Sequence, residues 1–116
     1  MTSPNYPYYY PRKVEKTEMI QVESGKIVRL EFTSFRVSVS GSVNDCKGDH
    51  VLITDGDGTI LMNKSCGYST YSTTHSYYFL PPVIHTNTNS VRVFFGASIS
   101  RDLGWSLSWG AVMPGL

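Results

Sequence analysis

The alternation of apolar and polar residues constrains this chain more than any other feature of its sequence. Residues 35–39 (FRVSV) alternate without a break, and residues 27–32 (IVRLEF) carry apolar side chains at alternate positions. A period of two is typical of a β-strand with one buried face, whereas an amphipathic helix repeats its apolar residues every three or four positions. Helical periodicity is almost absent here. The pattern therefore predicts an all-β fold of short antiparallel strands, either a sandwich or a barrel.

The alternating runs also predict which residues form the core. Clusters of Ser, Thr, Gly, Asn and Pro separate these runs, as turns do between strands. No internal repeat or linker divides the 116 residues, so we expect a single domain over residues 1–116. The predicted strands cover residues 27–32, 35–39, 50–53, 91–95 and 105–109. The predicted core residues are Val28, Leu30, Phe32, Val37, Val51, Ile53, Val93 and Phe95.

Charge and composition exclude several function classes. The formal net charge is +1 and the basic residues are scattered, which argues against a nucleic-acid partner. No apolar run approaches the roughly eighteen residues of a membrane span, so we expect no membrane insertion. His50, His75 and His85 lack the spacing of a metal or catalytic motif, and no nucleophile elbow or phosphate-binding loop is present. We therefore expect no enzyme, no cofactor and no catalytic residues.

Two cysteines and a glycosylation sequon bear on the compartment. Cys46 and Cys66 are either two buried free thiols or a disulfide, and we favour the disulfide because closing a loop of this length contributes roughly 3 kcal/mol. Asn63 begins the sequon Asn-Lys-Ser and is a candidate glycosylation site. These features favour a mature fragment of a secreted protein over a cytosolic one.

Residues 53–60 (ITDGDGTI) allow two interpretations, a calcium loop or a tight turn between strands. An EF-hand loop that began at Asp55 would need Gly at its sixth position and Glu at its twelfth, where this chain has Ile60 and Cys66. Asp-Gly between apolar runs is instead a strong hairpin signal, because Gly readily adopts positive φ. We therefore predict a hairpin turn.

The N-terminal residues 3–11 (SPNYPYYYP) cannot form a helix, because their three prolines remove backbone donors. Their four tyrosines either form a binding surface or pack as an extended segment across a sheet face. We favour the packed segment.

Five short motifs in order resemble the CUB domain of extracellular proteins. Gly104-Trp105 stands where the family has Gly-Phe, and the resemblance covers residues 3–112. The other motifs are SPNYP at 3–7 with YP at 10–11, GKIVRLEFTSF at 25–35, CKGDHVLITDG at 46–56 and Cys66-Gly67. The resemblance implies a jelly-roll-like β-sandwich and pairs Cys46 with Cys66 as the second family disulfide. Lys16 stands in place of a cysteine of the first disulfide. The family's first strand is expected to be missing, with a loosely held sheet edge unless residues 6–11 pack there.

The resemblance also concerns calcium. Many CUB domains bind Ca²⁺ with one glutamate and two aspartates, and use those carboxylates to hold a lysine or arginine of a partner. Asp49 matches the first aspartate, but the other two positions fall near Ser38 and Ser98. Asp45 and Asp102 are nearby in sequence as possible substitutes, and we do not expect them to complete a site. We therefore expect no metal, with Asp49 as a vestigial position.

These observations lead to a functional hypothesis. We expect a non-catalytic, calcium-independent extracellular module that binds a protein or a glycan, as part of a larger secreted or cell-surface protein. Each candidate contact residue also has the alternative of packing between the sheets. The candidates are Tyr8, Tyr9, Tyr10, Tyr68, Tyr71, Tyr77 and Tyr78. The alternative function is a structural, matrix-type protein that self-assembles through open sheet edges.

Overall fold

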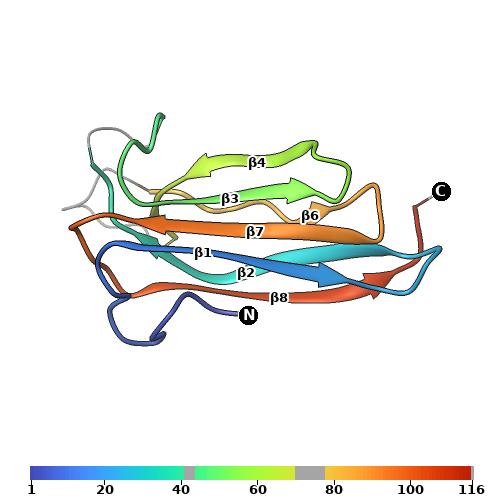
Figure 1. The fold of residues 1–116 in the computed structure, drawn as a ribbon, viewed down its shortest axis with the longest axis horizontal. Coiled ribbons are helices and arrows are strands. Elements are labelled where there is room, and N and C mark those ends of the chain that lie inside the picture. Colours follow the sequence, from blue (N-terminus) through green and yellow to red (C-terminus); the bar gives the residue numbers. More distant parts are fainter. Residues whose placement is uncertain (41–43, 70–77, 116) are drawn as a thin grey trace.

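The computed structural model describes residues 1–40, 44–69 and 78–115, and these form a sandwich of two antiparallel sheets. One sheet has the strand order β1-β7-β3-β4, and the other has the order β5-β2-β6 with β8 paired to the second edge of β2. The long strands run along the long axis of the molecule (Figure 1). The strand bounds are β1 Val14–Gln21, β2 Ile27–Val37, β3 His50–Asp55, β4 Ile60–Ser65, β5 Gly67–Tyr68, β6 Ile84–His85, β7 Ser90–Ala97 and β8 Gly104–Val112. The predicted all-β sandwich is confirmed.

The two predicted strands at 27–32 and 35–39 are one strand, β2, with an irregularity in its middle. Val28 and Leu30 are buried in its first half, whereas Phe35 and Val37 are buried in its second half. The pairing register with β8 shifts between Phe32 and Ser34. An extra residue at a bulge moves the side chains that follow onto the opposite face. The bulge therefore keeps both halves of β2 directed to the core although their alternation is out of phase.

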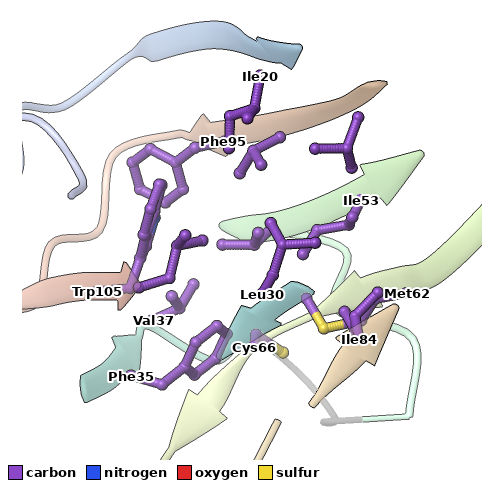
Figure 2. Packing of buried hydrophobic residues seen from close by; sticks show 14 of the residues in the cluster. Ile20, Leu30, Phe35, Val37, Ile53, Met62, Cys66, Ile84, Phe95 and Trp105 are labelled. Atoms are coloured by element: carbon purple, nitrogen blue, oxygen red, sulfur yellow. The ribbon is translucent and has the colours of Figure 1, made fainter. Parts of the chain in front are cut away.

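The core lies between the two sheets. Side chains from both sheets meet there, with Phe95 of β7 near Trp105 of β8 in the same cluster as Leu30 and Ile53 (Figure 2). Of the predicted core residues, only Phe32 is not buried. Its ring is half-buried and packs edge-on against Phe35 and Trp105, at centroid distances of 5.2 and 5.9 Å. The buried members of the prediction are Val28, Leu30, Val37, Val51, Ile53, Val93 and Phe95.

The strands that the alternation did not predict are mainly edge strands. β1 borders one sheet and exposes Glu15 and Lys16, so its sequence lacks a clean apolar period. Charged edge strands of this kind discourage pairing with other chains.

Residues 1–3 lie beside β8, because Leu107 donates its N–H to the Met1 carbonyl at 2.9 Å and Thr2 bridges to Ser106. The outer edge of β8 is therefore partly paired.

No helix in the described part of the chain is long and apolar enough to cross a membrane.

Candidate functional site

The N-terminal segment folds over the end of the sandwich where β8 begins (Figure 1). Ser3 is buried, donates its N–H to the Trp105 carbonyl at 2.9 Å and accepts the Trp105 N–H on Oγ at 2.9 Å. Gly104 has φ of 91°, and a Cβ there would lie 2.0 Å from the Ser3 Oγ. Further along, Tyr10 donates its N–H to the Asp102 carbonyl at 3.1 Å. Because the segment is anchored at Ser3 and at Tyr10, the residues between them form a loop with fixed ends.

A buried pair, Tyr10 and Asp49, lies beneath this loop. The Tyr10 ring packs edge-on against Phe95, and its hydroxyl donates to Asp49 Oδ2 at 2.5 Å. Asp49 Oδ1 accepts the N–H of Ser98 at 2.8 Å and its Oγ–H at 3.2 Å. Ser38 donates its N–H to the Tyr10 oxygen at 3.0 Å. Burial, and then the hydrogen bond to Asp49, raise the pKa of Tyr10 well above its ordinary value.

The structure thus brings together the three positions that the family resemblance assigned to calcium ligands. Asp49 supplies a carboxylate, but both of its oxygens accept hydrogen bonds, from Tyr10 and from Ser98. Ser38 approaches the pair through its backbone N–H. Within the described residues, no three His, Cys, Asp or Glu side chains gather in a way that could hold a metal ion. The cluster therefore offers one anionic group that is engaged on both oxygens.

Each of the two possible substitute carboxylates is paired with a basic side chain. Asp102 Oδ1 accepts from Arg36 Nε at 3.1 Å, and the Arg36 guanidinium stacks 4.7 Å above the Tyr68 ring. Asp45 Oδ2 lies 3.9 Å from Lys47 Nζ. Each carboxylate therefore has a cation of its own.

Three of the tyrosines proposed as contact residues lie in the N-terminal segment and have different environments. Tyr8 and Tyr9 are 72% and 53% exposed, so their rings are available to a partner. Tyr10 has no exposed surface, and our prediction that it contacts a ligand is wrong. Its ring is part of the hydrophobic core and its hydroxyl donates to Asp49, so Tyr10 supports the N-terminal loop from beneath.

The remaining tyrosine candidates lie in the second half of the chain. Tyr68 is half-buried under Arg36 and forms a parallel bridge with Tyr78, which is 44% exposed. Tyr71 and Tyr77 lie outside the described residues. A role of Tyr8, Tyr9, Tyr68 or Tyr78 in binding stays a prediction.

The structure adds two residues that the sequence did not indicate, Arg101 and Leu103. The Arg101 guanidinium lies 5.7 Å from the centre of the Tyr9 ring. An open hollow of about 360 Å³ is lined by these residues and the N-terminal loop. We call it the Tyr8–Arg101 pocket, and it is lined by Asn5, Tyr8, Tyr9, Arg101 and Leu103. Residues 98–103 are irregular, so no periodic pattern in the sequence points to them.

The disulfide between Cys46 and Cys66 is present, with a Cα–Cα distance of 5.6 Å, and both residues are buried. Asn63, the candidate glycosylation site, is exposed on β4. The Ser65 hydroxyl of the sequon donates to the Asn63 carbonyl at 2.7 Å. Glycosylation at Asn63 stays a prediction.

Residues 53–60 form the predicted hairpin between β3 and β4. Asp55 donates its N–H to the Thr59 carbonyl at 2.7 Å, and Gly58 has φ of 93°. The Asp55 side chain has a second role that the sequence did not reveal. It is fully buried and accepts the N–H groups of Gly56 and Asn87, both at 2.7 Å, and the Thr88 hydroxyl at 2.5 Å. Asp55 therefore attaches the loop before β7 to the hairpin.

Comparisons with known proteins agree on one family. The family model described as CUB domain matches residues 1–109. Cubilin from Rattus norvegicus is 30% identical over 111 residues, which cover 95% of this chain and 3% of cubilin. Complement C1s subcomponent from Bos taurus is 32% identical over 103 residues, which cover 86% of this chain and 14% of that protein. The crystal structure of the MASP-1 CUB2 domain bound to Ca²⁺ superimposes with a TM-score of 0.76 at 29% identity, covering 94% of this chain and 88% of that one. The chain spans a small part of the curated relatives it matches.

Proposed function

This chain belongs to the CUB domain family, whose members are modules of extracellular proteins, and on that premise we propose that it is a calcium-independent binding module. CUB domains are non-catalytic and typically mediate protein interactions. We extend this to the present chain, which we propose performs no chemistry and binds a protein partner through its loops. A glycan partner is the second ligand class that exposed tyrosine rings suit.

The hydrogen bonding of Asp49 is the observation that supports calcium independence. Ca²⁺ takes six to eight oxygen ligands and favours several carboxylates. Here Asp49 is the one carboxylate of the cluster, and Ser38 and Ser98 stand at the other two positions. Tyr10 and Ser98 supply the hydrogen bonds that hold the Asp49 oxygens in place of a metal. The residues present do not fit the ion.

Calorimetric titration with calcium tests this proposal. We expect no heat of binding at millimolar calcium, and capture of a secreted partner that is unaffected by chelator. The double variant Ser38→Glu with Ser98→Asp supplies the two missing carboxylates and serves as the positive control. A dissociation constant tighter than about 100 μM for the unmodified domain, lost in Asp49→Ala, would overturn the proposal; that affinity lies at the strong limit of extracellular modules.

Self-assembly through sheet edges is less well supported. β1 carries Glu15, Lys16 and Glu18 on an outer strand, and residues 1–3 partly cover the edge of β8. Charged and covered edges oppose strand addition. Light scattering at rising protein concentration separates the two functions, because a binding module stays monomeric.

A further inference from the structure

The Tyr8–Arg101 pocket combines exposed aromatic rings with a cation. Arg101 is exposed, and within the described residues its guanidinium has no ion pair. It lies instead over the Tyr9 ring at 5.7 Å. A cation held against an aromatic ring is ordered at a small cost in hydration and remains able to bind an anion.

The loop that carries the two tyrosines is organised before any ligand arrives. Asn5 Nδ2 donates to the Tyr9 carbonyl at 3.1 Å, and Tyr8 donates its N–H to the Asn5 carbonyl at 2.9 Å. The buried anchors Ser3 and Tyr10 lie on either side. Exposed aromatic rings on a fixed loop lose little conformational entropy when they bind, which is typical of residues that dominate interfaces.

The charge around the pocket is positive. Lys13 donates its N–H to the Ser98 carbonyl at 2.6 Å, so the exposed Arg12 and Lys13 border the same pair of loops as Arg101. Among the acidic groups at this end, Asp102 is paired with Arg36 and Asp49 lies beneath the loop. Glu15 is exposed at the start of β1, where the basic residues Arg12, Lys13 and Arg101 outnumber it. A lysine of a partner would be repelled here, whereas a carboxylate would be attracted.

We propose that the Tyr8–Arg101 pocket binds an acidic side chain, Asp or Glu, of a partner polypeptide. This rests on the proposed binding function and names its ligand chemistry. A carboxylate accepts two parallel hydrogen bonds from the Arg101 guanidinium, and the Tyr8 hydroxyl is a further donor. Leu103 and the tyrosine ring faces cover the methylene groups of the ligand. The pocket thus selects a charge opposite to the one that a calcium-bearing CUB site would hold.

Chemical-shift mapping with a capped hexaglutamate peptide tests the proposal on the ¹⁵N-labelled chain. We expect shifts confined to the loops at residues 5–13 and 98–103, which weaken as salt is added. Arg101→Glu should lower the affinity at least about tenfold, because attraction becomes repulsion. Arg92→Glu is the matched control, since Arg92 is exposed on β7, paired in register with Thr54 near the hairpin end, and this variant should bind as the unmodified chain does.

Each other outcome contradicts the proposal. Absent shifts, shifts that persist in Arg101→Glu, or an equal response to hexalysine would remove the acidic-ligand assignment. A response to a sialylated trisaccharide without one to hexaglutamate would assign the pocket to a glycan instead. The failure of this proposal can be told apart from the failure of the proposed function. Partner capture that resists chelator and is unchanged by Arg101→Glu would support the binding function and exclude only this pocket.

Discussion

The two ends of strand β3 each hold a buried aspartate, and the two residues have different roles. Asp49 precedes the strand and Asp55 ends it, with 1% and 0% of their surfaces exposed. Both oxygens of each carboxylate accept hydrogen bonds. At the Asp55 end two of the donors are backbone N–H groups of Gly56 and Asn87, which lie in the adjoining turn and loop. At the Asp49 end a donor to one oxygen is the hydroxyl of Tyr10, 39 residues away in sequence.

This difference shows how one residue type serves two purposes. The Asp55 end consists of short polar turns, and its carboxylate attaches them to one another. The Asp49 end is where the N-terminal loop and residues 98–103 meet, above the aspartate that matches a calcium ligand of many CUB domains. Here the hydrogen bonds from Tyr10 and Ser98 hold both oxygens of Asp49 beneath the loop that carries the exposed Tyr8 and Tyr9. The hairpin end is thus structural, and the loop end is the candidate for recognition.

Asp55→Ala should produce the largest loss of stability. It leaves the donors of Gly56, Asn87 and Thr88 without their acceptor, which we expect to lower the free energy of unfolding by about 3–5 kcal/mol. Denaturant unfolding with the disulfide intact measures this loss. Asp55→Asn keeps one acceptor oxygen and should lose less. A loss below about 1 kcal/mol for Asp55→Ala would show that water replaces the carboxylate.

Tyr10→Phe should cost less, about 1–3 kcal/mol. The ring still fills its place against Phe95, but Asp49 loses a donor and Ser38 loses the acceptor of its N–H. Tyr9→Phe is the matched control and should stay within about 0.5 kcal/mol, since that ring is on the surface. Equal effects of the two variants in denaturant melts would mean that the Tyr10 hydroxyl does not support the loop end.

The raised pKa of Tyr10 predicts a smaller effect at alkaline pH. The ordinary pKa of tyrosine is 10.0, and above that pH the unfolded chain releases the Tyr10 proton while the folded chain keeps it. The contribution is therefore present below pH 10 and declines as pH rises, on the order of 1 kcal/mol at pH 11. Unfolding curves at pH 9 and 11 measure this decline. Tyr10→Phe should lack this part of it, and an identical decline in both proteins would contradict the assignment.

Asp57→Ala should have the smallest effect. Asp57 lies in the same turn as Asp55, but it is exposed. It accepts the Thr59 N–H at 2.9 Å and also the Thr59 hydroxyl, and these hydrogen bonds lower its pKa. Its contribution is present above the ordinary carboxyl pKa and is lost as pH falls below it. At neutral pH we expect the thermal midpoint of Asp57→Ala to lie close to that of the unmodified chain. A loss as large as that of Asp55→Ala would remove the contrast between the two aspartates.

The sequence by itself determined the class of fold, the hairpin at Asp55 and the buried faces of its central strands. These features follow from alternation and turn chemistry, which act between neighbouring residues. The resemblance to CUB motifs added the pairing of Cys46 with Cys66, which the structure contains.

Only the tertiary structure decided the fates of similar residues in irregular segments. Tyr8, Tyr9 and Tyr10 are consecutive, yet two are exposed and one is fully buried, because no period relates side chains outside a regular strand. Asp55 and Asp57 read alike in the turn, but Asp55 alone meets the loop at 86–90, a contact between segments about thirty residues apart. The role of Arg101 in a pocket could not be predicted from the sequence, because the pocket forms only where residues 98–103 meet residues 5–9. The burial and the hydrogen-bond partners of these residues depend on which distant segment packs against them. Local sequence patterns contain no information about such contacts, because they relate only neighbouring residues.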